Sequence, residues 1–174
     1  MLVVFGGLPG TGKTTIARAV AGRLRAVYLR IDEIEQAIRS AAVLAADVGP
    51  AGYVVANALA ASNLANDQVV VADCVNPVAE SREGWRATAA RARKPLLEVE
   101  IVCSDPVEHR RRVELRRPDI DGHEIPTWQA VMAREYAPWP EPHVIVDTAR
   151  LSARESVDLV EQQIQLLSGR RVGD

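Results

Sequence analysis

The pattern of apolar and polar positions along the chain predicts five strands separated by helices. Leu2–Phe5 and 69–72 are short continuous apolar runs, as is typical of strands buried on both faces of a sheet. Residues 27–31 and 97–101 alternate, which predicts strands with one wetter face, and 144–146 reads as a fifth strand. Strands that alternate with helices are typical of a parallel sheet.

The segments between these strands carry apolar residues at helical spacing. Ile16, Val20 and Leu24 define a helix that starts near Lys13, and Ser152 with Glu155 forms the capping box of the last helix. Further helices are predicted after Asp32 to about Arg39 and over 53–64, 79–92, 105–117 and 128–136. The sequence therefore predicts an α/β fold: a five-stranded parallel sheet with helices on both faces, in a single domain spanning 1–174.

Composition narrows the class of protein. The chain has 174 residues, 48% of them hydrophobic and 25% charged, with a net charge of -2. This balance gives no global field for attracting nucleic acid or acidic membranes, and no apolar run reaches 18 residues. Two cysteines without metal-ligand spacing fit a reducing compartment. We therefore expect a cytoplasmic protein with no membrane partner, as a monomer or a homodimer.

A phosphate-binding loop follows the first strand. The stretch from Gly7 to Thr14 satisfies GxxxxGK(S/T) between a strand and a helix. In such a loop the backbone amides surround phosphate oxygens, the lysine reaches the β and γ phosphates, and the last hydroxyl binds Mg²⁺. The predicted nucleotide-binding residues here are Gly7, Leu8, Pro9, Gly10, Thr11, Gly12, Lys13, Thr14 and Thr15. We expect Lys13 to be solvated when the loop is empty.

The remaining motifs separate the classes of phosphate-loop protein. The NKxD element of GTPases does not occur, and Asp73-Cys74 replaces the acidic pair of a motor ATPase. The loop together with YLRIDEIEQAIR, GYVVANALAASNLAND, VVVADCVNP, SREGWRATAARA, CSDPVEHRRRVELR and VIVDTA resembles the small P-loop kinases over nearly the whole chain. That group includes chloramphenicol phosphotransferase, gluconate and shikimate kinases, zeta toxins and polynucleotide 5′-kinases, and proteins described only as AAA-family ATPases or predicted kinases.

The resemblance assigns roles to two aspartates at strand ends. Asp32 follows the second strand, where similar kinases place the carboxylate that accepts the proton of the substrate hydroxyl. The same residue also fits a helix N-cap, with Glu35 as its capping-box partner. Asp73 follows a buried strand, where the resemblance implies that it holds Mg²⁺ together with Thr14. The alternative for Asp73 is an Asx-turn before Asn76-Pro77.

Other positions match the kinases more weakly. The resemblance places Asn76 and Arg82 near the acceptor substrate, although ordinary loop and surface roles fit them equally well. Tyr53 could border the acceptor pocket or pack in the core. By resemblance, Asp147 and Thr148 after the fifth strand approach the adenine. The three histidines lack ligand spacing.

An arginine-rich segment precedes a stretch rich in Asp, Gly and Pro. Arg112 and Arg116 lie one turn apart on the predicted helix, so both could face the transferred phosphoryl group or simply lie on a solvated surface. With few carboxylates expected near its arginines, 110–126 is predicted to be a mobile lid. Asp119-Ile120-Asp121-Gly122 reads as a turn, and 169–174 as a flexible tail.

The sequence therefore favours a kinase that uses ATP and Mg²⁺ to phosphorylate a hydroxyl of a small molecule. In this hypothesis Lys13, Asp32, Arg112 and Arg116 carry the chemistry. A polynucleotide or tRNA kinase is the alternative enzyme, although the overall charge does not favour nucleic acid. A nucleotide-sensing protein that switches conformation without transferring phosphate is the alternative outside enzymes.

Overall fold

The computed structural model describes residues 1–42 and 47–169, and it contains the predicted parallel sheet. All strand pairs are parallel, and the strand order is β2-β3-β1-β4-β5. The strands are β1 (Leu2–Gly6), β2 (Val27–Arg30), β3 (Val70–Asp73), β4 (Leu96–Val102) and β5 (Val144–Asp147). The predicted tail lies outside the described residues, apart from Gly169 at the end of the last helix.

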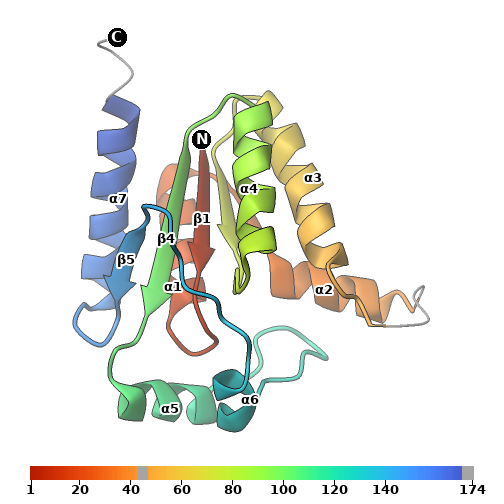
Figure 1. Cartoon of the computed structure of the whole chain (residues 1–174), viewed down its shortest axis with the longest axis vertical. Helices are drawn as coiled ribbons and strands as arrows, with labels where there is room; N and C mark the ends of the chain where they lie inside the picture. Colours follow the sequence, from red (N-terminus) through yellow and green to blue (C-terminus); the bar gives the residue numbers. More distant parts are fainter. Residues whose placement is uncertain (43–46, 170–174) are drawn as a thin grey trace.

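Helices cover both faces of this sheet and its carboxyl edge (Figure 1). One face carries α1 (Lys13–Leu24) and α7 (Ala153–Gly169), and the other carries α3 (Ala51–Ala65) and α4 (Ala79–Arg91). The helix α2 (Ile31–Ser40) directly continues β2, while α5 (Pro106–Leu115) and α6 (Trp128–Met132) lie beyond the carboxyl ends of the strands. Folds of this type bind ligands at the carboxyl ends of the strands, so the loops that follow the strands are the candidates for a binding site.

The central strand β1 is buried on both faces, as its apolar run predicts. Val3 and Phe5 pack in the cluster formed with α1 and α7, while Leu2 and Val4 pack in the cluster formed with α3 and α4. All five residues of β1 are buried. The loop that follows β1 is therefore anchored to a fully buried central strand.

Three sequence predictions need correction. The helix predicted over 128–136 ends at Met132, and Tyr136 instead donates a hydrogen bond to Glu100. The helix predicted to reach 117 ends at Leu115, where Arg116 becomes extended. The face of β2 that was predicted to be more exposed to solvent is buried at Arg30, which is only 2% exposed. For Tyr136 and Arg30, a tertiary contact outweighs the local pattern.

Candidate nucleotide and acceptor site

The loop between β1 and α1 adopts a conformation that requires glycine. Gly7, Gly10 and Gly12 have φ values of 137°, 86° and 94°. A Cβ atom at Gly7 would lie 2.2 Å from the Ile101 carbonyl oxygen, and one at Gly10 would lie 2.5 Å from the Val113 side chain. The glycines thus allow the backbone to turn tightly between β4 and α5.

The N-terminus of α1 faces this loop without a competing carboxylate. The helix begins at Lys13 with no side-chain cap and no acidic residue in its first turn. Its first amides therefore have no intrahelical partner, and the helix dipole adds partial positive charge. Such an end is suited to bind an anion such as phosphate.

Lys13 is not solvated, contrary to the sequence expectation. The residue is 9% exposed, and its Nζ atom donates to the Leu8 carbonyl at 3.5 Å. The hydroxyl of Thr11 donates to the same carbonyl at 2.9 Å. The loop therefore folds back on its own lysine, because the buried ammonium needs an acceptor.

Contacts from α5 and the β5–α7 turn hold the loop from outside. The Nε2 atom of His109 lies 2.8 Å from the Pro9 carbonyl oxygen. Arg112 donates to both the hydroxyl and the carbonyl of Thr148, and the Thr148 hydroxyl lies 2.8 Å from the Thr11 carbonyl, to which it can donate. In this structure Arg112 supports the loop through Thr148. Asp147 accepts from the Ser104 and Ala149 amides and so shapes the turn.

Two adjoining cavities open beside the loop. Cavity A has a volume of about 520 Å³ and is lined by loop residues, by the face of α2, by 122–126 and by Arg134. Cavity B has a volume of about 440 Å³ and lies between α1 and the arginines at the end of α5 and just after it. Lys13, Thr14 and Arg116 line both cavities. Ligands in the two cavities would therefore meet at these three side chains.

A third cavity continues from the loop toward β5. Cavity C has a volume of about 300 Å³ and is lined by Gly12, Thr15, Arg112 and Thr148, among others. The structure thus brings Thr148 to the loop. Asp147 does not line cavity C.

Asp32 lies in cavity A, but it is not a helix cap. Helix α2 begins at Ile31 directly after β2, its N-cap is Arg30, and no side chain caps it. Asp32 therefore lies in the first turn, where the helix dipole favours a carboxylate. Its side chain is 31% exposed, and its closest ion-pair contact is Arg30 at 3.9 Å. This leaves its oxygens available to a ligand in cavity A.

Asp73 ends β3 beside β1, pairing in register with Phe5. It is 3% exposed, and its Oδ2 atom accepts from the Tyr28 hydroxyl at 2.7 Å, whereas its Oδ1 atom accepts no hydrogen bond from the described residues. A carboxylate oxygen and the Thr14 hydroxyl are hard donors that suit Mg²⁺. No group of three or more His, Cys, Asp or Glu that could hold a metal occurs among the described residues, so phosphate oxygens would have to complete the coordination.

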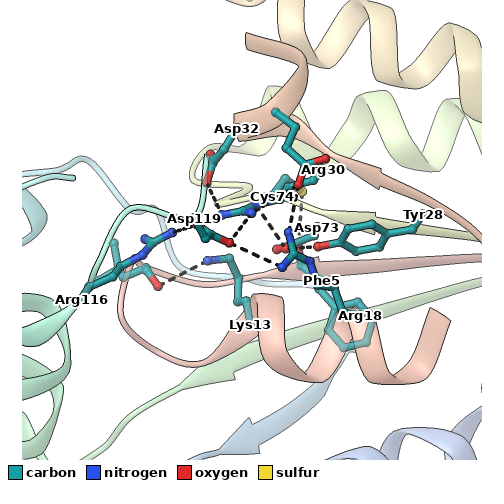
Figure 2. Close-up of polar contacts among 12 residues, drawn as sticks. Phe5, Lys13, Arg18, Tyr28, Arg30, Asp32, Asp73, Cys74, Arg116 and Asp119 are labelled. Carbon is teal, nitrogen blue, oxygen red and sulfur yellow. Dashed lines mark hydrogen bonds and ion pairs between the residues drawn. The ribbon is translucent and has the colours of Figure 1, made fainter. Parts of the chain in front are cut away.

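The pattern of the chain did not single out Arg30, which connects the two aspartates. Its guanidinium binds both oxygens of Asp119, at 2.7 and 3.0 Å, and it also lies near Asp32 and 4.0 Å from Asp73 (Figure 2). The same guanidinium lies 3.4 Å from Glu33. An arginine two residues before the strand-end aspartate Asp32 was the available signal, but its partner Asp119 is 89 residues away.

The sequence analysis did not assign four further charged residues of cavity A to a site: Glu35, Arg39, Glu124 and Arg134. Glu35 follows Asp32 by one turn, and burial together with the Asp32 charge raises the pKa of its carboxyl group above the ordinary value. Arg134 lines the cavity from the segment after α6. The helical spacing of Asp32 and Glu35 was a usable signal, whereas the position of Arg134 depends on where α6 ends.

The other predicted acceptor residues lie away from cavity A. The Tyr53 hydroxyl accepts a hydrogen bond from the backbone amide of Asn76, and the Tyr53 ring packs near Trp85. Asn76 is fully buried, and Arg82 donates to the Ala137 carbonyl beneath the sheet edge. None of Tyr53, Asn76 and Arg82 lines cavity A or cavity B.

The arginines of the predicted lid have carboxylate partners, contrary to the sequence expectation. Glu108 pairs with Arg111 and Arg112, Glu114 with Arg110, and Asp119 with Arg116. Asp119 also has a role beyond a turn, since it binds Arg30. The stated reason for expecting a mobile lid over 110–126 is therefore wrong.

The glycine-turned loop at the end of β1 and the five-stranded parallel sheet are the features of a P-loop nucleotide-binding fold. A family model described as "AAA domain" matches residues 2–137, and the chain belongs to this family. A search of curated proteins found no match. No described helix is both long enough and apolar enough to cross a bilayer.

Solved structures share the fold over almost the whole chain. A gluconokinase from Sinorhizobium meliloti 1021 matches with a TM-score of 0.64 and 21% identity, covering 97% of this chain and 96% of that one. The APS kinase CysC of Mycobacterium tuberculosis, in complex with AMPPNP and APS, matches with a TM-score of 0.66 and 20% identity, covering 96% of each chain. Chaetomium thermophilum Kti12, in complex with ADP-AlF3, matches with a TM-score of 0.64 and 22% identity, covering 96% and 98%.

Proposed function

We propose that this protein is an ATP- and Mg²⁺-dependent kinase that transfers the γ-phosphoryl group to a hydroxyl of a small molecule. The observation that carries the proposal is that Lys13 and Thr14 of the phosphate loop line the same cavity as the Asp32 carboxylate. A volume of about 520 Å³ suits a small-molecule ligand. The gluconokinase and APS kinase folds are consistent with this proposal.

Nucleotide binding would begin at the loop. The first amides of α1 and the Lys13 ammonium, once it leaves the Leu8 carbonyl, bind the phosphate oxygens. Thr14 and Asp73 would hold Mg²⁺, which when bound neutralises charge on the β and γ phosphates. Thr148 and Asp147 would border the nucleoside.

The transfer itself would take place where cavities A and B meet. The acceptor hydroxyl hydrogen-bonds to the Asp32 carboxylate, its oxygen forms a bond to the γ phosphorus, and the bond from that phosphorus to the ADP oxygen breaks. The hydroxyl proton passes to Asp32. Arg116 lines both cavities, so its guanidinium lies where negative charge develops. Arg112 would act through Thr148, and 122–126 would limit the access of water to cavity A.

Substitution of the two strand-end aspartates tests the roles. A metabolite screen scored by conversion of ATP to ADP, with a 5′-hydroxyl oligonucleotide as one arm, first identifies the acceptor. Asp32→Asn should then keep ATP affinity within a few fold and lower acceptor-dependent turnover by roughly 100-fold or more, because it removes the proton acceptor. Asp73→Asn should weaken Mg²⁺-dependent ATP binding as well as turnover, because its proposed partner is the metal.

Asp67→Asn, the same change at an exposed aspartate that pairs with Lys94 and lines neither cavity A nor cavity B, is the control and should keep near-parental turnover. Parental turnover in Asp32→Asn would remove Asp32 from the reaction. Turnover with the oligonucleotide alone would favour a polynucleotide kinase. Nucleotide binding without ATP consumption for any acceptor would favour a nucleotide sensor.

A further inference from the structure

Cavity B is lined by many cations and a single carboxylate. Its charged lining residues are Lys13, Arg18, Arg111, Arg112, Arg116 and Arg117, with Asp119 as the only anion. A cavity of this composition beside a phosphate loop attracts a polyanion. The presence of the Asp119 carboxylate in this cavity therefore requires a physical reason.

Asp119 is held there by three arginines from three parts of the chain. Arg30 at the end of β2 binds it through two hydrogen bonds of 2.7 and 3.0 Å. Arg18 of α1 and Arg116 after α5 each lie 3.6 Å from one of its oxygens. Figure 2 shows the side chain of Asp119 beside Arg30, with Arg116 and Arg18 around it. The arrangement is that of an anion bound in a cationic pocket.

Asp119 lies where its carboxylate would repel the phosphates of a bound nucleotide. Lys13 and Thr14 line the same cavity, and these are the loop residues that act on the β and γ phosphates. A phosphate chain placed there would share Arg18 and Arg116 with the Asp119 carboxylate and would be repelled by it. Adenosine alone would not meet this charge, because cavity C, on the β5 side of the loop, is not lined by Asp119.

We propose that Asp119 is an intramolecular competitor for nucleotide phosphates and so sets the affinity and selectivity of the phosphate cavity. The carboxylate is covalently tethered to the site, so its effective concentration is high. A ligand must release it from Arg18 and Arg116 before its phosphates can engage them. The apparent affinity is then the intrinsic affinity multiplied by the fraction of molecules in which Asp119 has released these arginines. This penalty applies to any phosphate chain, with or without a nucleoside, and not to uncharged adenosine.

Calorimetric titration of Asp119→Asn with three probes tests this inference. The amide keeps the shape of the side chain and removes its charge. We expect the Kd values of Mg-ATP and of inorganic tripolyphosphate to fall by about three- to tenfold, and that of adenosine to stay unchanged. The gain for ATP should shrink as ionic strength rises, because the repulsion is screened.

Asp121→Asn is the matched control, since Asp121 is exposed on the same segment and does not line cavity B. Unchanged or weaker ATP binding in Asp119→Asn would overturn the proposal, because Asp119 would then serve only to position the arginines. An equal gain for adenosine, or an equal gain in Asp121→Asn, would also overturn it. Thermal unfolding reports whether Asp119→Asn is folded, and Asp119→Ser gives a second neutral variant for the same titrations. These readouts measure binding alone, so they are independent of whether phosphate is transferred.

Discussion

Arg30 is the residue on which the charges of the site converge. It is a nearly buried cation with carboxylates from α2, from β3 and from the segment after α5 around it. Its Nε atom has no hydrogen-bond partner among the described residues. Removing such a cation would leave buried and half-buried carboxylates facing one another, which costs more than the loss of any one ion pair.

Lys13 gives the most direct test of the nucleotide site. Lys13→Ala should abolish the increase in melting temperature that Mg-ATP gives the parent, because a ligand stabilises only the state it binds. Since the lysine stem is buried, we also expect the variant to lose roughly 1 kcal/mol in free energy of unfolding.

Lys94→Ala is the control for this measurement. Lys94 is the only other lysine, and it pairs with Asp67 away from the cavities. It should keep the full ATP-dependent shift. Equal shifts in Lys13→Ala and the parent would contradict the assignment of the phosphate loop.

Asp119 also predicts a pH dependence. The hydrogen bonds from Arg30 lower the pKa of its carboxyl group to about 2, below the ordinary value of about 3.9. Because the folded pKa is the lower one, the ionised carboxylate stabilises the fold above about pH 4, and this contribution is lost as pH falls toward 2. Urea denaturation from pH 5 to pH 2 should show the stability difference between the parent and Asp119→Asn shrinking over this window. A difference that stays constant would mean that the ion pair does not stabilise the fold.

Among the helices, α5 makes the contacts that hold the phosphate loop from outside. His109, Val113 and Arg112 face the loop or its neighbour Thr148, and the N-cap Asp105 accepts from the amides of Val107 and Glu108, as its sequence predicts. The position of the loop backbone therefore depends on the position of α5.

Two neighbouring arginines of α5 allow a matched comparison. Both Arg111 and Arg112 pair with Glu108, but only Arg112 reaches Thr148. We expect Arg112→Met to speed hydrogen exchange of the loop amides 10–14 in the nucleotide-free protein, and Arg111→Met to leave it near the parental rate. Equal exchange in the two variants would show that the Thr148 contact does not stabilise the loop.

The whole molecule is expected to unfold as one unit. The apolar clusters on the two faces share β1, so neither can form fully without the central strand. In urea, the circular dichroism signal and the fluorescence of the fully buried Trp85 should follow a single coincident transition. Non-coincident transitions would show that the two layers unfold separately and would contradict the prediction of one domain.

The pattern of the sequence was sufficient for the sheet, the order of its elements and the phosphate loop. These features depend on local periodicity, and a loop of this kind is defined by glycines that only a tight turn requires, as at Gly7 and Gly10. Asp32 was also found at the correct edge, because the carboxyl ends of parallel strands meet there. The capping box at Ser152 and Glu155 formed as predicted, since all of its atoms lie within four residues.

Tertiary structure alone decided how the charges of the site are paired. The bond between Arg30 and Asp119 joins the end of β2 to a loop beyond α5, and nothing local to either residue specifies the other. The end of α6 before Tyr136 and the use of Arg112 on Thr148 likewise depend on partners far along the chain. Periodicity determines which face of an element is apolar, whereas the partner of a long charged side chain depends on which elements the fold brings within its reach.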